Sequence, residues 1–177
     1  MLGKPHGDFV PVAPLTVVLY DVEDDRDEQR RRLSAALRQF DATPADVHDR
    51  LIVTGPTAVG TLFELDNDTG AIRQTDAIKQ LRALLVKHRP DLLVVDPLAE
   101  LHTAPENDNT ALRAVVARLR SLAVEFSMAV IVLHHTRKGG AVPGDPDAAR
   151  GASSTVGAAR IVLTLCPMSE DDCDLLA

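Results

Sequence analysis

The sequence predicts an α/β fold built around a mainly parallel sheet. Two short apolar runs, residues 92–95 and 129–133, end in the polar residues Asp96 and His134. Runs this short and rich in β-branched residues are typical of buried parallel strands. Strand-like and helix-like periodicity alternate along most of the chain, which favours helices on both faces of the sheet. Aromatic residues make up only 3% of the 177 residues, so we expect an aliphatic core.

The expected strands share an apolar, β-branched composition and turn-forming flanks. They cover residues 16–20, 51–54, 92–95, 129–133 and 160–165. A small hairpin is expected where residues 62–65 and 71–73 flank the turn-forming segment 66–70.

The expected helices begin at residues that are typical N-caps or lie beside them. They cover about residues 25–40, a short turn after Thr43 and Pro44, 75–88, 110–126 and 153–158. The first helix has an apolar stripe of Leu33, Ala36, Leu37 and Phe40. We interpret its arginines, at positions 30, 31, 32 and 38, as a solvated helix face.

Composition narrows the function classes. The length favours one domain covering residues 1–177, with a mobile loop at 137–149 and a tail at 167–177 that stops mid-pattern. A net charge of −7 argues against non-specific electrostatic binding of nucleic acid by the whole surface. Cys166 and Cys173 lack the spacing of a zinc site and are expected to be reduced thiols. No apolar stretch has the length of a signal peptide or a membrane span, so we expect a cytoplasmic protein.

Two acids follow expected strands at the edge of the sheet where open α/β proteins bind ligands. Asp96 ends its strand directly before Pro97, a position suited to Mg²⁺ coordination through water. The alternative for Asp96 is a structural cap of the next turn. Glu23 could orient and deprotonate an attacking water, or it could simply be an acid at a helix N-terminus.

Two histidines and two basic residues are further candidates for the functional site. His134 and His135 point to opposite faces if both lie on a strand, so they are poor joint ligands of one metal. One could be a buried core histidine and the other could contact a γ-phosphate. Lys138 begins the glycine- and proline-rich loop, where it is either solvated or in contact with phosphate. Arg150 follows the loop and is either a surface salt-bridge residue or an arginine that reaches the γ-phosphate of a neighbouring subunit.

Taken in order, these segments resemble the RecA-like P-loop ATPase core, in the RepA-like branch of hexameric replicative helicases, which is grouped with the AAA-family ATPases. The matching pieces are V-V-L-Y-D-V-E-D-D, R-P-D-L-L-V-V-D-P-L, E-N-D-N, A-V-I-V-L-H-H-T-R-K and A-R-G-A-S-S. They span about residues 16–165.

The resemblance implies ATP and Mg²⁺ as cofactors and a role for each matching residue. Glu23 is similar to the catalytic glutamate and Asp96 to the Walker B aspartate that holds Mg²⁺. His135 falls where relatives place a γ-phosphate sensor, beside His134. Arg150 resembles an arginine finger supplied in trans, and Lys138 belongs with the same loop. The resemblance also implies a hexameric ring and single-stranded DNA as a partner.

The chain departs from that pattern at its beginning, because G-x-x-x-x-G-K-S/T does not occur. We expect the P-loop strand and helix, and the final strands of the core, to be missing. Without the backbone N–H groups and lysine that hold phosphates, this chain alone is expected to turn over ATP weakly or not at all. Two alternatives stay open: a non-catalytic remnant or oligomerisation module, and a regulatory ATPase of the circadian-clock type.

Overall fold

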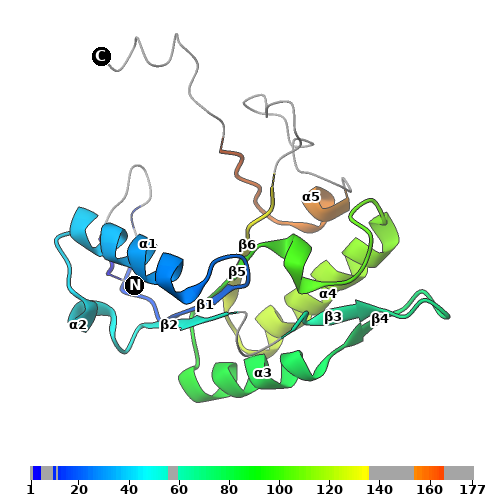
Figure 1. Ribbon diagram of the computed structural model, residues 1–177, viewed down its shortest axis with the longest axis horizontal. Helices are drawn as coiled ribbons and strands as arrows, with labels where there is room; N and C mark the ends of the chain where they lie inside the picture. The colour runs from blue at the N-terminus through cyan, green and yellow to red at the C-terminus, as the bar shows by residue number, and fades with distance from the viewer. Residues whose placement is uncertain (1, 5–9, 11, 56–59, 136–153, 166–177) are drawn as a thin grey trace, which may run out of the picture.

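A computed structural model describes residues 2–4, 10, 12–55, 60–135 and 154–165 of the chain. Within this part, four parallel strands form one sheet in the order β2-β1-β5-β6 (Figure 1). They are β1 (Val17–Asp21), β2 (Leu51–Thr54), β5 (Leu92–Asp96) and β6 (Ala129–Val132). The predicted α/β fold with a parallel sheet is therefore confirmed. The loop expected at 137–149 and the tail at 167–177 lie outside the described residues.

The helices that connect the strands start where the sequence places N-caps. They are α1 (Arg26–Gln39), α2 (Pro44–Val47), α3 (Asp76–His88), α4 (Asn109–Glu125) and α5 (Ser154–Ala158). Asp25, Thr75 and Asp108 each accept hydrogen bonds from backbone N–H groups in the first turn of α1, α3 and α4. Each bond satisfies a donor that the helix itself leaves unpaired. A 3₁₀ helix at Leu98–Leu101 follows β5 directly.

The predicted hairpin is present as a separate two-stranded sheet. Its strands, β3 (Phe63–Leu65) and β4 (Ile72–Gln74), are antiparallel. The side chain of Asp66 accepts the backbone N–H groups of Asp68 and Thr69 and so closes the turn. Phe63 anchors the hairpin in the hydrophobic core.

Side chains alternate between the two faces of the central sheet. Val18, Tyr20, Leu93 and Val95 are fully buried in one cluster with apolar residues of α3 and α4. The intervening residues of β1 and β5, ending in Asp21 and Asp96, face the opposite side. Figure 1 shows α1 on that opposite side, so helices cover both faces as predicted.

The helix α1 packs less deeply than its sequence predicts. Leu37 is buried, Leu33 and Phe40 are partly buried, and Ala36 is exposed.

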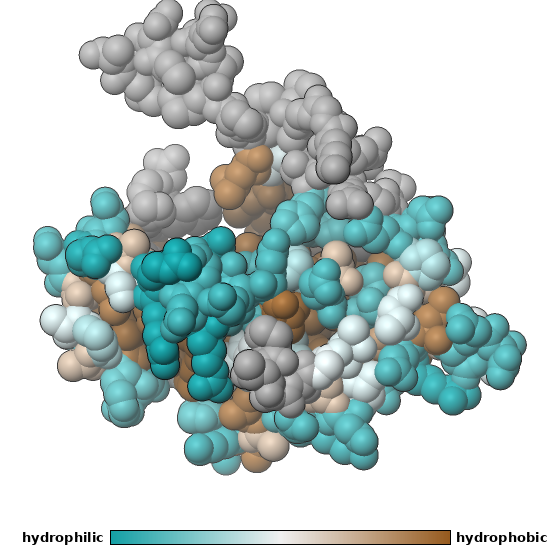
Figure 2. All heavy atoms as spheres, in the orientation of Figure 1, coloured by the Kyte–Doolittle hydropathy of each residue, from teal (hydrophilic) through white to brown (hydrophobic). Residues whose placement is uncertain are grey.

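The last predicted strand, residues 160–165, is not a strand in the structure. Among the described residues it has no strand neighbour, and without a ladder its backbone forms no sheet. Its apolar side chains are exposed, with Ile161 at 79% and Leu165 at 91%. Figure 2 shows this apolar segment standing clear of the body of the molecule.

The edge strand β6 is open on its outer side within the described residues, because β5 is its only neighbour there. Ile131 is half exposed and Leu133 is also partly open to solvent. No helix among the described residues is long and apolar enough to cross a membrane.

Candidate functional site

Two acidic residues meet at the carboxyl end of the central strands. Asp21 and Asp96 are the last residues of β1 and β5, and they are direct partners in the parallel register. The backbone N–H of Val22 donates to the carbonyl oxygen of Asp96 at 2.8 Å, so β1 stays attached to β5 to its very end. The paired positions place both carboxylates on the α1 side of the sheet.

Asp21 shapes the turn that follows β1. Its side chain is buried, with 5% of the residue exposed. The Oδ1 atom accepts the backbone N–H groups of Glu23 at 3.1 Å and Asp24 at 3.0 Å. A carboxylate that accepts two N–H groups makes charge-assisted bonds, which fix the local backbone more firmly than neutral ones.

Glu23 and His135 lie together although they are far apart in the chain. Glu23 lies in the turn after β1, and His135 follows β6. The Nε2 atom of His135 is 3.6 Å from Oε2 of Glu23, and both side chains are about half exposed. Since β5 runs between β1 and β6, this pair spans the end of the strand that carries Asp96.

Arg32 connects helix α1 to the acidic turn. Its guanidinium lies 2.9 Å from Oδ2 of Asp24 and 2.9 Å from Oε1 of Glu28. Partial burial raises the pKa of Asp24, and the nearby Arg32 opposes that rise. The helix face is solvated as predicted, but one of its arginines also neutralises an acid of the turn.

Asp96 has the electrostatics of a cation site. Burial raises the pKa of its carboxyl, and the negative charges of Asp21, Glu23 and Asp24 raise it further. A divalent cation would relieve this repulsion, so the residues present fit Mg²⁺. In nucleotide sites Mg²⁺ takes one or two carboxylates and completes its shell with phosphates and water. Among the described residues, no group of three or more His, Cys, Asp or Glu side chains is arranged to hold a metal ion.

His134 lies within electrostatic range of a second histidine, His102. The buried His102 lies on the other side of the sheet, where its Nδ1 is 3.1 Å from the carbonyl oxygen of Ala104. Burial lowers the pKa of His102, and the charge of His134 contributes to that lowering. His134 and His135 both follow the end of β6. His135 lies beside Glu23, whereas His134 is close enough to His102 to affect its pKa.

Two of the sequence-predicted site residues, Lys138 and Arg150, lie outside the described residues. The structure brings together Glu23, Asp96 and His135. Three further residues of the same edge, Asp21, Asp24 and Arg32, were not among the sequence candidates.

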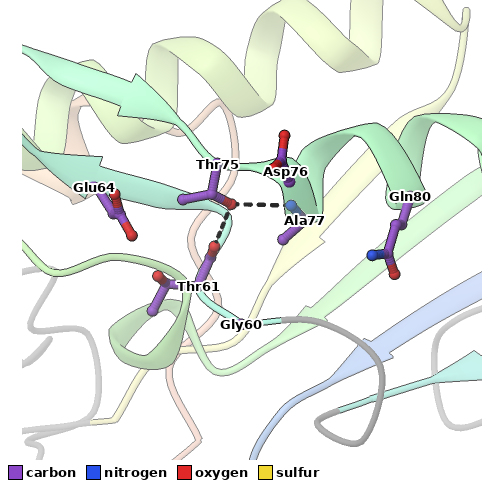
Figure 3. A pocket seen from close by; sticks show the side chains of 7 residues that line it. All are labelled: Gly60, Thr61, Glu64, Thr75, Asp76, Ala77 and Gln80. Atoms are coloured by element: carbon purple, nitrogen blue, oxygen red, sulfur yellow. Dashed lines mark hydrogen bonds between the residues drawn. The ribbon is translucent and has the colours of Figure 1, made fainter.

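A surface hollow of about 270 Å³ lies elsewhere, between the hairpin and the start of α3 (Figure 3). Thr75 donates its hydroxyl to the carbonyl oxygen of Thr61 at 2.6 Å and accepts the N–H of Ala77 at 3.2 Å. The only acids in its lining are Glu64 and Asp76, and Asp76 pairs with Lys79. The hollow contains none of the residues that converge at the strand ends.

The family of the chain follows from comparison with known proteins. A family model described as AAA domain matches residues 1–141, most of the chain. The chain belongs to the AAA domain family. An AAA domain is an ATPase-type domain, and the matched range includes the whole acidic edge and both histidines.

The residues that the sequence analysis missed do carry a signal. One face of β1 carries Val17, Leu19 and Asp21, because side chains alternate along a strand at a period of two. Asp21 therefore lies on the same side of the sheet as the candidate cation site at Asp96. Asp24, Glu28 and Arg32 follow one another at intervals of four, the spacing of side chains that meet along a helix. Both signals depend on knowing first where the strand ends and the helix begins.

Proposed function

We propose that this AAA domain binds Mg²⁺ and ATP and hydrolyses ATP at the carboxyl edge formed by β1, β5 and β6. The observation that carries the proposal is the convergence of Glu23, Asp96 and His135 at the ends of three separate strands. Ligands of open α/β sheets bind at this edge.

Asp96 has the role of holding the cation, because its carboxylate ends the central strand among other negative charges. Mg²⁺, when bound there, neutralises the charge on the phosphate oxygens. Glu23 is half exposed and close to Asp96 in the fold, so it can accept a proton from a water that it orients. The half-exposed position leaves that water free to enter.

His135 has the role of a γ-phosphate sensor. Its ring already touches Glu23, so a phosphate that attracts His135 also changes the surroundings of the proposed base. Lys138 follows three residues later and would contact phosphate, and His134 would belong to the same set of nucleotide-binding residues. Arg150 would reach the site of a neighbouring subunit as an arginine finger.

A finger supplied in trans requires neighbours, so the proposal includes a ring, hexameric in the helicase-type form. The RepA-like replicative helicase is the form of the activity that we favour, with single-stranded DNA as its partner. A non-catalytic oligomerisation module is the second candidate, and the open edge of β6 with the exposed segment 160–165 favours it.

Single-turnover hydrolysis of γ-labelled ATP with protein in excess tests the proposal, because it detects even very slow chemistry. Loss of a general base costs typically 10²–10⁴-fold, so Glu23→Gln should lower the rate by at least about 100-fold. Glu28→Gln is the matched control, since Glu28 pairs with arginines of α1 and not with His135. Asp96→Asn should remove the dependence on Mg²⁺.

Equal rates for the wild type and Glu23→Gln, or no Mg²⁺-dependent hydrolysis at all, would refute the catalytic proposal and leave the oligomerisation module. Addition of a single-stranded oligonucleotide separates the helicase form from other ATPases. Stimulation of the rate supports a DNA transaction, and its absence argues against one.

A further inference from the structure

We infer that Asp21 is the positioning residue that holds Glu23 over the end of β5. The inference rests on the proposed function, since it assigns a residue that makes the proposed base effective. Asp21 itself faces the α1 side and is buried, so it does not have the exposure that Glu23 has for contact with a reacting water.

The first argument is the pattern of hydrogen bonds. One oxygen of Asp21 accepts the backbone N–H of Glu23 and of Asp24, the two residues at the top of the turn. Removal of that acceptor leaves two N–H groups without their partner in a partly buried turn. The backbone of Glu23 would then be free to rotate, and its carboxylate would lose its place beside His135.

The second argument is that the turn is fixed from both sides. Val22, between Asp21 and Glu23, donates its N–H to the carbonyl of Asp96. Asp24 is held by Arg32, and the amide of Gln29 donates to the carbonyl oxygen of Asp24 at 3.2 Å. Glu23 is thus the residue of the turn whose side chain points outward between anchored neighbours, and Asp21 is the anchor that bonds its backbone directly.

The chain offers a control of the same chemistry one turn further along. Asp25 also accepts two backbone N–H groups through one oxygen, from Asp27 at 2.9 Å and Glu28 at 2.8 Å. Those bonds hold the start of α1 and do not involve Glu23. Asp25→Ala therefore removes as many hydrogen bonds as Asp21→Ala without freeing the proposed base.

The substitution Asp21→Asn separates geometry from charge. The amide oxygen of asparagine can accept both N–H groups, whereas alanine has no acceptor. We expect Asp21→Asn to keep the turn and Asp21→Ala to lose it. Asp21→Leu, which has similar branching but no acceptor, gives a second variant that keeps the buried volume.

The first measurement is independent of ATP. Amide exchange in the full chain, followed by NMR, should accelerate about tenfold or more at Glu23 and Asp24 in Asp21→Ala and Asp21→Leu. The nuclear Overhauser contact between Glu23 and His135 should disappear in the same variants. Asp21→Asn and Asp25→Ala should retain both. Retention of the contact and of slow exchange in Asp21→Ala and Asp21→Leu would overturn the inference.

The second measurement is single-turnover hydrolysis together with the Kd for Mg²⁺-ATP. Because a misplacement near 1 Å can cost about 100-fold in rate, the rate constant should fall by that order in Asp21→Ala while the Kd stays within about twofold. Asp21→Asn should restore most of the rate. A loss of binding and rate together, without rescue by asparagine, would show a merely structural role. Failure of the proposed function is seen separately, as equal hydrolysis by the wild type and Glu23→Gln.

Discussion

Gly55 lies directly after β2, where the chain passes the end of β1 at very close range. A Cβ atom at this position would lie closer than 3.0 Å to the carbonyl oxygen of Asp21, and 2.9 Å from Nε2 of Gln29. Ordinary contacts of this kind begin at 3.4 Å. The glutamine side chain can move away, but the carbonyl belongs to the backbone of the strand that leads into the Glu23 turn.

The substitution Gly55→Ala should therefore displace that turn rather than merely fill space. Relief of the overlap requires a backbone shift on the order of 1 Å, and overpacking of this kind typically costs about 1–3 kcal/mol. For a chain of this length the melting temperature should fall by roughly 2–10 °C. The same shift moves Glu23 relative to Asp96, so the rate constant for ATP hydrolysis should fall by about 100-fold.

Gly60→Ala is the matched control, because a Cβ atom at Gly60 meets nothing within 4 Å. Neither glycine has a positive φ angle, so the comparison isolates steric overlap from backbone strain. Thermal denaturation and single-turnover hydrolysis of both variants are the assays. If Gly55→Ala melts and hydrolyses like Gly60→Ala, the close approach of β2 to the end of β1 does not position the turn and the reasoning is wrong.

Two further substitutions test the electrostatics and the open edge. At pH 7 without Mg²⁺, Asp96→Asn should raise the free energy of unfolding by about 0.5–2 kcal/mol and so raise the melting temperature. Substitutions at functional sites often stabilise a protein in this way. The sign follows from the raised pKa of Asp96: ionisation costs stability at pH values above the folded-state pKa, and the cost vanishes below the ordinary value of 3.8. The gain should therefore be lost near pH 3, and an equal gain at both pH values would contradict the electrostatic cause. At the sheet edge, Ile131→Lys should reduce self-association in sedimentation velocity, whereas Val124→Lys, on the exposed face of α4, should not. A wild type that stays monomeric at high concentration would show that β6 is not an associating edge.

Most of the secondary structure could be predicted because its signals are local. The run Leu92–Asp96 forms the central strand where its composition places it, and the hairpin flanks the turn closed by Asp66. Helix starts are equally local, since Thr75 and Asp108 accept N–H groups two or three residues away. A sequence pattern that involves only a few neighbouring residues predicts the local structure correctly, because distant parts of the chain do not alter it.

The failures depend on distant partners. Residues 160–165 have the composition of a strand, but a strand exists only beside another strand, and none is adjacent in the described structure. The apolar stripe of α1 is visible in the sequence, but the extent to which each of its residues is buried is not, because burial depends on what packs against the helix. The contact of Glu23 with His135 is equally invisible in the sequence, because it depends on the strand order that places β5 between them.

That strand order also shapes how the proposed site would open. Neighbouring strands lie about 4.8 Å apart, so the ends of β1 and β6 are separated by roughly 10 Å across β5. Glu23 and His135 nevertheless approach to 3.6 Å, because each side chain leans over the end of β5 toward the other. Asp96 ends the strand that they span, so a phosphate bound through a cation on Asp96 must come close to this pair. Both side chains are half exposed, and the pair can part without disturbing the core. The backbone beneath Glu23 accepts no such freedom, because the N–H groups of Glu23 and Asp24 both bond to Asp21.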